Sequence, residues 1–182
     1  MRIKIAILGS TGSIGKSTLE IIKKNKSKFN VELLMAQNNF KALINQAKIF
    51  RAANVLIVNK KYYARIKKAL STTKTKVFFG DKPVNTIITK KVDYTMSAIV
   101  GIAGLKPTVE AIKCSKKIAI ANKEAIICGW NILSKYIKKY KTKVLPVDSE
   151  HFSIMELSKK LNNNDIEEII LTASGGPFFK TP

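Results

Sequence analysis

Three glycines spaced three residues apart, Gly9, Gly12 and Gly15, constrain this chain more than any other stretch of its sequence. An apolar run over residues 3–8 precedes them and predicts a buried strand, and residues 14–24 have the periodicity of a helix. Glycines at a strand-to-helix turn let the backbone approach a phosphate, and the helix N-terminus offers unpaired N–H groups and a positive dipole end. The turn therefore predicts a dinucleotide site, although a plain strand-to-helix turn would show the same short pattern.

The rest of the chain alternates between predicted strands and predicted helices. This alternation is typical of an α/β fold with a doubly wound, mostly parallel, Rossmann-like sheet. We expect strands at residues 3–8, 31–36, 54–58, 76–79, 94–100, 117–121, 143–146 and 167–173. We expect helices at residues 14–24, 40–51, 60–70, 105–114 and 151–161, a short helix capped by Asp81 and ending near Thr89, and a helical stretch up to about residue 139 with a break at Gly129 as one alternative.

The charge of the chain is strongly basic, with 33 Lys and Arg against 12 Asp and Glu and a net charge of +21. Thirty of the basic residues are Lys, and they are scattered along the predicted helices. Nucleic-acid binders favour Arg and basic residues interleaved with aromatic ones, and the sequence shows neither pattern. We therefore interpret the lysines as solvated surface, with a nucleic-acid-binding face as the alternative.

Targeting and redox features are few. The apolar stretches are too short to span a bilayer, and the N-terminus lacks the pattern of a secretory signal. Cys114 and Cys128 are isolated thiols without metal-ligand spacing. These features favour a reducing, cytoplasmic setting.

The strand at residues 31–36 ends where a dinucleotide-binding fold holds the adenosine ribose. An acid at this point would bind the ribose 2′-hydroxyl of NAD. The chain has Gln37, Asn38 and Asn39 instead, with Lys41 close behind. Because this segment has no acid to repel a 2′-phosphate, the sequence leans toward NADP.

Two later strand ends carry charged residues. Asn122, Lys123 and Glu124 could aim an amine at a phosphate or carbonyl oxygen, or Asn122 could simply cap a helix with Glu124 in its first turn. Asp148 and Glu150 would point to the same side of an extended segment and offer hard oxygen ligands suited to Mg²⁺ or Mn²⁺. A helix start at these residues is the alternative.

Ser174 follows the last predicted strand and could bind a hydroxyl or a phosphate, or stand in an ordinary turn. His151, the one histidine, is interpreted as a supporting or merely exposed residue. No base is paired by spacing to a serine, which excludes a serine hydrolase.

Taken together, these stretches resemble the N-terminal part of the 1-deoxy-D-xylulose 5-phosphate reductoisomerase family. The matching segments are residues 9–15, 98–101 with 104–105, 121–124, 146–151 and 172–178, in the family's order. The resemblance implies conversion of 1-deoxy-D-xylulose 5-phosphate to 2-C-methyl-D-erythritol 4-phosphate in non-mevalonate isoprenoid synthesis, with NADPH and a divalent metal (Mg²⁺, Mn²⁺ or Co²⁺). It also implies an NADPH-binding domain over residues 1–121 and the beginning of a catalytic domain over residues 122–182.

The resemblance assigns roles to individual residues. Asp148 and Glu150 would bind the metal, and together with Lys123 they would be the catalytic residues. Lys123, Ser149, Glu150 and Ser174 would contact the phosphorylated sugar. The cofactor would be bound by Thr11, Gly12, Ser13, Ile14, Asn39, Asn122 and Glu124.

The chain also departs from the family's pattern. Gln37 stands where many members have Gly, Asn38 where they have a basic residue, Ala125 replaces a common Ser, and Phe179 a common Arg. Family enzymes are much longer than 182 residues. We therefore expect an N-terminal piece that binds NADPH weakly and is inactive by itself, and a homodimer in the full-length enzyme, located in the bacterial cytoplasm or a plastid-type organelle. The alternatives are another NAD(P)-dependent oxidoreductase or nucleotide-binding module, which Asp148 and Glu150 disfavour, and a basic nucleic-acid binder.

Overall fold

The computed structural model describes residues 2–147 and 149–170. Contacts between residues divide the chain into a first unit, Met1–Leu145, and a second unit, Pro146–Pro182. The predicted functional boundary at Ala121 lies inside the first unit and stays a prediction about roles. No helix among the described residues is long and apolar enough to cross a membrane.

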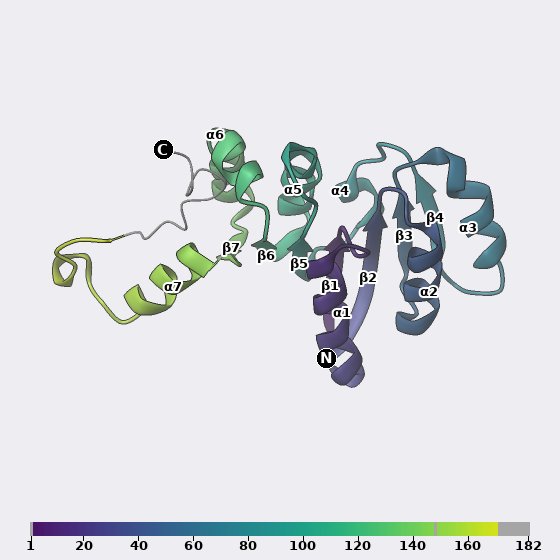
Figure 1. Cartoon of the computed structure of the whole chain (residues 1–182), viewed down its shortest axis with the longest axis horizontal. Coiled ribbons are helices and arrows are strands. Elements are labelled where there is room, and N and C mark those ends of the chain that lie inside the picture. Colours follow the sequence, from purple (N-terminus) through teal and green to yellow (C-terminus); the bar gives the residue numbers. More distant parts are fainter. Residues whose placement is uncertain (1, 148, 171–182) are drawn as a thin grey trace, which may run out of the picture. The chain divides into compact units, whose positions relative to one another are not determined.

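The first unit is built on a sheet with the strand order β4-β3-β2-β1-β5-β6-β7 (Figure 1). Parallel ladders join β4 through β6 in that order. The strands are β1 (Ile3–Leu8), β2 (Phe29–Ala36), β3 (Asn54–Ile57), β4 (Lys76–Phe79), β5 (Val92–Ser97), β6 (Ser115–Ile120) and β7 (Lys143–Pro146). The chain builds outward from β1 to β4 and then returns to place β5 on the other side of β1. This reversal makes the β1–β5 boundary the switch point at which α/β sheets bind ligands. The predicted doubly wound, mostly parallel sheet is confirmed.

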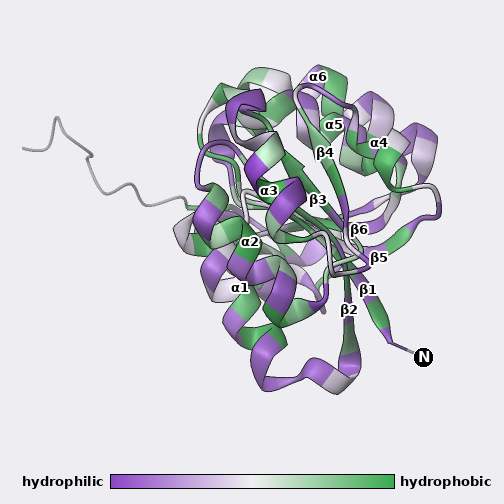
Figure 2. Cartoon of the chain, turned by 90° about the vertical axis from the view of Figure 1, so that its right-hand side faces the viewer, coloured by the Kyte–Doolittle hydropathy of each residue, from purple (hydrophilic) through white to green (hydrophobic). Residues whose placement is uncertain are grey.

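Helices cover both faces of this sheet. They are α1 (Ser13–Lys24), α2 (Phe40–Phe50), α3 (Tyr63–Ala69), α4 (Val84–Ile87), α5 (Leu105–Lys113) and α6 (Lys123–Tyr140), with short 3₁₀ turns η1 (Lys26–Lys28), η2 (Lys60–Tyr62) and η3 (Ile102–Gly104). Figure 2 shows the apolar strands enclosed and much of the helix surface polar. The sheet therefore has two buried faces, as parallel sheets require.

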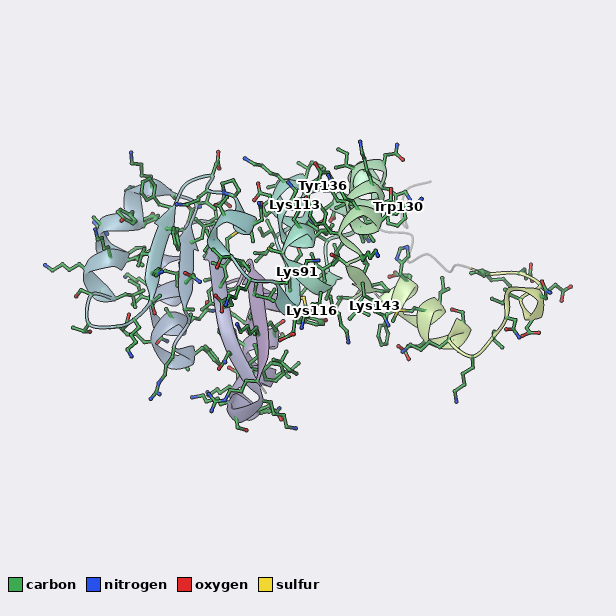
Figure 3. All side chains as sticks on the ribbon, turned by 180° about the vertical axis from the view of Figure 1, so that it is seen from behind. Lys91, Lys113, Lys116, Trp130, Tyr136 and Lys143 are labelled. Carbon is green, nitrogen blue, oxygen red and sulfur yellow. The ribbon has the colours of Figure 1, made fainter. Side chains whose placement is uncertain are left out.

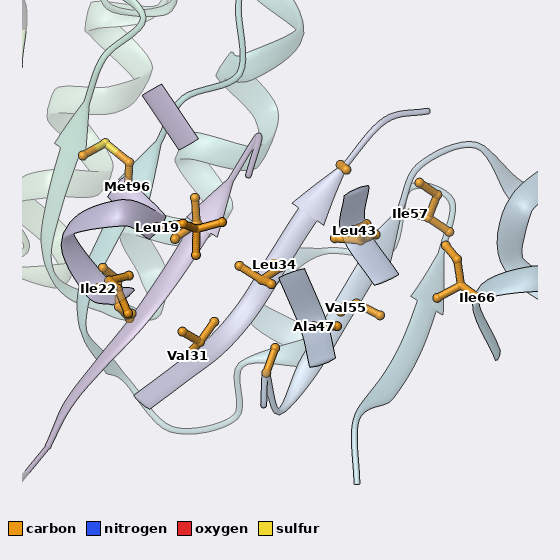
Figure 4. Packing of buried hydrophobic residues seen from close by; sticks show 14 of the residues in the cluster. Leu19, Ile22, Val31, Leu34, Leu43, Ala47, Val55, Ile57, Ile66 and Met96 are labelled. Atoms are coloured by element: carbon orange, nitrogen blue, oxygen red, sulfur yellow. The ribbon is translucent and has the colours of Figure 1, made fainter. Parts of the chain in front are cut away.

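The core follows the two-residue period of the strands. In β1, Ile5 and Ile7 pack into one apolar cluster, whereas Ala6 and Leu8 pack into the other. The first cluster collects side chains from α1, α2 and α3 (Figure 4). The second cluster collects side chains from α4, α5 and α6. The members of each cluster are buried, so both faces contribute to stability.

Two sequence predictions about helices are wrong, each for a packing reason. The helix α6 runs unbroken through Gly129, where a Cβ would lie 2.3 Å from Leu105 Cδ1 of α5. This glycine permits close helix packing and does not end the helix. Asp81 does not cap α4, whose N-cap is Pro83. Instead, the Val84 N–H donates to Glu110 Oε2 of α5 at 2.9 Å.

Lysines on the first unit are often held against aromatic rings. Lys113 Nζ lies 4.9 Å from the ring centroid of Tyr136, and Lys91 Nζ donates to the Tyr140 carbonyl at 2.9 Å (Figure 3). Eight cations lie within about 6 Å of a ring centroid among the described residues, the distance at which a ring attracts a cation. Half of these pairs join residues within four positions of each other, whereas the others, such as Lys113 and Tyr136, are distant in sequence and no local pattern marks them.

The described part of the second unit holds α7 (Ser149–Ser158) and the 3₁₀ turn η4 (Asn163–Asp165). None of the residues of α7 is buried. The helix begins two residues before the predicted start at His151. Residues 167–170 form no strand, so the prediction for 167–173 is wrong over that part, and residues 171–173 lie outside the described residues.

Candidate functional site

The glycine turn joins β1 to α1, and its three glycines differ in what surrounds them. Gly9 has a φ of +82°, and a Cβ there would lie 2.6 Å from the Ala98 carbonyl oxygen. A Cβ on Gly15 would lie 2.3 Å from the Gly9 carbonyl oxygen. Gly12 has room on its open side, since its Cβ would meet just the Gly9 carbonyl oxygen, at 3.4 Å. Gly9 and Gly15 are therefore required for packing, and Gly12 keeps space free for a ligand.

At the N-terminus of α1, no described side chain accepts a hydrogen bond from the first backbone N–H groups. Gly12 is the N-cap, no side chain caps the helix, and its first turn has no acid. The first backbone bond into the turn is from Lys16 N–H to the Gly12 carbonyl at 2.9 Å. Among the described residues, the N–H groups of Ser13 and Ile14 therefore have no acceptor. Unpaired N–H groups at the positive end of a helix dipole suit a phosphate.

A cleft of about 420 Å³ opens beside this turn, within the size range of small-molecule sites. It lies at the carboxyl ends of five parallel strands, β1 to β5, and is lined there by Gly9, Ala36, Val58, Gly80 and Ala98. Its other lining residues include Thr11, Gly12, Met35, Gln37, Asp81, Lys82, Ile99, Val100, Ala103, Lys106, Pro107 and Glu110. The cleft spans the switch point of the sheet, which is the expected place for a dinucleotide.

Sequence reasoning found part of this cleft. Thr11 and Gly12 line it, and Ser13 and Ile14 follow in the exposed first turn of α1. The ends of β3 and β4, with Val58 and Gly80, were missed. The rule that ligands bind at strand ends applies to these strands as well and would have found them.

Asn39 sits at the N-terminus of α2, directly after β2. Its side chain oxygen accepts from the Ala42 N–H at 3.1 Å, and its Nδ2 donates to no other described residue. Asn38 is engaged differently, accepting a hydrogen bond at 2.9 Å from Asn59 Nδ2. Asn39 therefore keeps an amide donor free at the edge of the cofactor segment.

The buried side chain of Asn122 holds the start of α6 and the segment after β5 together. It is 4% exposed, and its side-chain oxygen accepts from the Ala125 N–H at 3.1 Å. Its Nδ2 donates to the carbonyls of Ile99 and Gly101, at 2.6 and 2.5 Å. Both amide hydrogens are thus used, which confirms the helix-cap alternative. A cofactor contact by Asn122 would have to use its main chain.

Lys123 and Glu124 begin α6 and are exposed. They form no ion pair with each other or with any other described residue, so Glu124 does not orient the Lys123 amine. Glu124 lies in the first turn, where the helix dipole favours a negative charge. The lysine is therefore a free cation at the end of β6.

The predicted metal residues fall at the start of the second unit. Asp148 and Ser174 lie outside the described residues. Ser149 and Glu150 are exposed and stand in the first turn of α7. The prediction of an extended segment is therefore wrong for these two residues, and the helix-start alternative is confirmed for them. Among the described residues, no group of three potential metal-ligating side chains comes together.

Titratable groups with shifted pKa values lie away from the cleft lining. Burial raises the pKa of the Cys114 thiol to about 11, so this cysteine remains a protonated core residue at neutral pH. A hydrogen bond from Lys116, together with the Lys4 N–H, lowers the pKa of Asp93 below its ordinary value. Neither group has the setting of a catalytic residue.

Comparison with known proteins gives a consistent result. The profile of the family described as 1-deoxy-D-xylulose 5-phosphate reductoisomerase matches residues 5–129, and the profile of that enzyme's C-terminal domain matches residues 144–182. The chain is 51% identical over 177 residues to the reductoisomerase of Pelagibacter ubique, covering 96% of this chain and 46% of the relative. It is 44% identical to that of Wolbachia pipientis wMel, covering 96% of this chain and 44% of the relative.

Two solved structures that are similar to this chain are reductoisomerases as well. The reductoisomerase of Zymomonas mobilis in complex with NADPH has a TM-score of 0.91 at 36% identity, covering all of this chain and 48% of that one. A reductoisomerase in complex with magnesium has a TM-score of 0.84 at 30% identity, with the same coverage of the two chains. The chain spans about half the length of the relatives that it matches.

Proposed function

The chain belongs to the 1-deoxy-D-xylulose 5-phosphate reductoisomerase family, and on this premise we propose that it supplies the NADPH-binding part of such an enzyme. The proposed reaction converts 1-deoxy-D-xylulose 5-phosphate to 2-C-methyl-D-erythritol 4-phosphate. The observation that carries the proposal is the cleft at the ends of β1 to β5, with the uncapped N-terminus of α1 on its edge. A structural relative that covers the whole chain at a TM-score of 0.91 is described in complex with NADPH.

The residues present fit the cofactor. The N–H groups of Ser13 and Ile14 would donate to its pyrophosphate, and the open side of Gly12 leaves room for the approach. Asn39 would donate its free amide to the ribose phosphate. When bound, NADPH supplies the hydride that reduces the rearranged sugar. Thr11 would line the pyrophosphate path, and Asn122 and Glu124 would border the nicotinamide half.

We assign the charge that selects the 2′-phosphate to cations on neighbouring segments, because the end of β2 has none. Lys41 lies in the first turn of α2, and Arg65 of α3 lies 5.6 Å from the ring centroid of Phe40, the first residue of α2. Phe40 stacks on Tyr62 at 4.7 Å, and Lys61 lies 5.9 Å from the Tyr62 ring. Between Glu32 and Asp81 the sequence has ten basic residues and no acid. This region therefore favours the additional phosphate of NADPH.

For the sugar, we assign Lys123, Ser149, Glu150 and Ser174 as substrate contacts, and Asp148 and Glu150 as metal ligands. Carboxylate oxygens suit Mg²⁺ or Mn²⁺, and a bound metal would polarise the sugar oxygens as a Lewis acid. Lys123 is a free cation on a rigid helix end, and it would stabilise negative charge that develops on a substrate oxygen. Asp148, Glu150 and Lys123 are therefore the proposed catalytic residues.

The first test is a fluorescence titration of the 182-residue chain with NADPH, followed by an assay with substrate and Mn²⁺. We expect weak, saturable NADPH binding without turnover, because the chain spans about half of its relatives' length and its described part assembles no group of three metal ligands. Absence of NADPH binding would contradict the cofactor assignment, and NADPH oxidation with substrate would contradict the expected inactivity.

Assembly, partners and location are further proposals. We expect a homodimer in the full-length enzyme, a cytoplasmic location and no nucleic-acid partner. Light scattering of the full-length enzyme tests the dimer. Filter binding with duplex DNA at physiological salt tests the nucleic-acid alternative, because binding driven by phosphate charge falls steeply with salt.

A further inference from the structure

Helix α2 is tied to the glycine turn by a pair of side-chain hydrogen bonds. Ser10 Oγ donates to Gln46 Oε1 at 2.8 Å, and Gln46 Nε2 donates to the Ser10 carbonyl at 2.9 Å. Ser10 is fully buried, and Gln46 is half-buried in the last half of α2. One glutamine side chain thus satisfies both the hydroxyl and the carbonyl of a residue 36 positions earlier.

These bonds hold the glycine turn at Ser10, between Gly9 and Gly12. The Gly9 and Ser10 N–H groups both donate to the Met35 carbonyl of β2, at 3.0 and 2.9 Å. With the Ser10 carbonyl fixed by Gln46, the turn is restrained on both its donor and its acceptor groups. A buried carbonyl without this partner would carry a desolvation penalty and would favour other turn conformations.

The same helix begins three residues after Gln37, which lines the cleft, in the segment proposed for the adenosine ribose phosphate. Asn39 is the N-cap of α2, and Gln46 lies about two helical turns further on. Helix α2 therefore contacts the segment proposed for the ribose phosphate at its start and the segment proposed for the pyrophosphate near its end. A shift of α2 would change the spacing between these two phosphate sites.

We propose that Gln46 is a positioning residue for the dinucleotide, which fixes the pyrophosphate-binding turn at a set distance from the adenosine end. The inference rests on the proposed NADPH function and adds a residue that does not itself line the cleft. Gln46 acts through Ser10, and its contribution is preorganisation of the turn, so that binding does not have to order it.

The test compares two ligands on the 182-residue chain by isothermal titration. NADPH uses both ends of α2, whereas adenosine 2′-monophosphate has no pyrophosphate and uses just the adenosine end. For Gln46→Leu, which loses both hydrogen bonds to Ser10, we expect NADPH binding to be weaker by roughly tenfold or more, and an adenosine 2′-monophosphate affinity within about twofold of wild type.

Three companion variants separate positioning from loss of stability. Asn45→Leu replaces an exposed amide on the same helix and should leave both affinities unchanged. Ser10→Ala keeps the bond to the Ser10 carbonyl and should weaken NADPH binding less than Gln46→Leu does. Gln46→Glu can still accept from Ser10 Oγ but cannot donate to the Ser10 carbonyl, and its carboxylate would face that carbonyl oxygen, so it should also weaken NADPH binding clearly. Ser10→Ala and Gln46→Glu each remove just one of the two bonds, so they keep the test usable if Gln46→Leu does not fold.

The outcomes are distinct. Unchanged NADPH affinity in Gln46→Leu and Gln46→Glu overturns the inference while leaving the proposed function intact. An equal loss for both ligands also overturns it, because a general loosening of α2 would then explain the effect. A wild-type chain that binds no NADPH overturns the proposed function and this inference with it.

Discussion

The two units of the chain differ in both burial and charge. All buried core residues of the described structure belong to the first unit, whereas none of the residues of α7 is buried. The first unit carries 30 Lys and Arg against 6 Asp and Glu, and the second carries 3 against 6. The first unit thus has the core, the cations and the cleft that a polyanionic cofactor requires. The second unit supplies carboxylates of the kind that bind a metal.

This difference separates the two halves of the proposed activity. Cofactor binding depends on a preformed sheet edge, so it can be measured on this chain directly. Metal binding is proposed for Asp148 and Glu150, which belong to a unit whose described part has no buried helix residue. Substitutions in the first unit should therefore change the free energy of unfolding and the NADPH affinity. Substitutions in the second unit should change the metal affinity.

The largest expected effect is on stability. Leu34 of β2 is fully buried, so Leu34→Ala should lower the free energy of unfolding by about 2–5 kcal/mol. Leu157 of α7 is 77% exposed, and Leu157→Ala should change it by less than about 0.5 kcal/mol. Urea denaturation measures the free energy of unfolding of both variants, and an equal loss in the two would contradict the difference in burial between the units.

The next effect is on the cofactor. Gly12→Val projects a side chain into the open side of the turn, where the nearest atom to its Cβ, the Gly9 carbonyl oxygen, would lie 3.4 Å away. We expect roughly hundredfold weaker NADPH binding, about 2.7 kcal/mol, with little change in the unfolding midpoint. Fluorescence titration and denaturation of the same sample check this. NADPH affinity equal to wild type would mean that the ligand does not approach Gly12.

A change in the second unit should act on metal. Asp148→Asn should weaken Mn²⁺ binding by roughly tenfold or more, because a hard cation loses an anionic ligand, and should leave NADPH affinity unchanged. Electron paramagnetic resonance of free Mn²⁺ measures the Mn²⁺ affinity, and Glu150→Gln serves as a second variant. If Mn²⁺ affinity stays the same in both variants, these residues act as a helix start and not as ligands.

The sequence predicted local features of the molecule better than distant ones. The strand at 3–8, the glycine turn and the switch-point sheet follow from patterns within a few residues or from a regular alternation. The bonds of Gln46 to Ser10 and of Glu110 to Val84 join residues 36 and 26 positions apart, and no local pattern marks them. The role of Gly129 could not be predicted either, because it depends on close contact with Leu105 of another helix.

A smaller effect concerns the choice between NADPH and NADH. Arg65→Gln should reduce the preference for NADPH by roughly fivefold, since one charge near the 2′-phosphate is lost. Lys67→Gln is the matched control, because Lys67 is on the same helix and lies against a different ring, that of Tyr63. Paired titrations with the two cofactors measure the ratio. An equal change in both variants would point to overall charge and not to Arg65.

The smallest effect is the pH dependence of one ion pair in the first unit. Lys116 and the Lys4 N–H lower the pKa of Asp93, so this carboxylate stabilises the fold above its ordinary pKa and the effect is lost as pH falls through the lowered value. Asp93→Asn should cost less than about 1 kcal/mol at pH 7, because the Lys116 side chain is largely exposed, and nothing at a pH below the lowered pKa. Urea denaturation of both proteins at the two pH values measures the cost of Asp93→Asn, and a larger loss of stability in acid than at pH 7 would contradict this prediction.

The central claim is that NADPH binds at the glycine turn of the first unit. Amide chemical shifts of the isotope-labelled chain, followed during an NADPH titration, test it most directly. The account predicts the largest shifts at Ser13 and Ile14, whose N–H groups have no acceptor among the described residues, and negligible shifts across α7. Saturable binding with no change at Ser13 and Ile14 would contradict the claim.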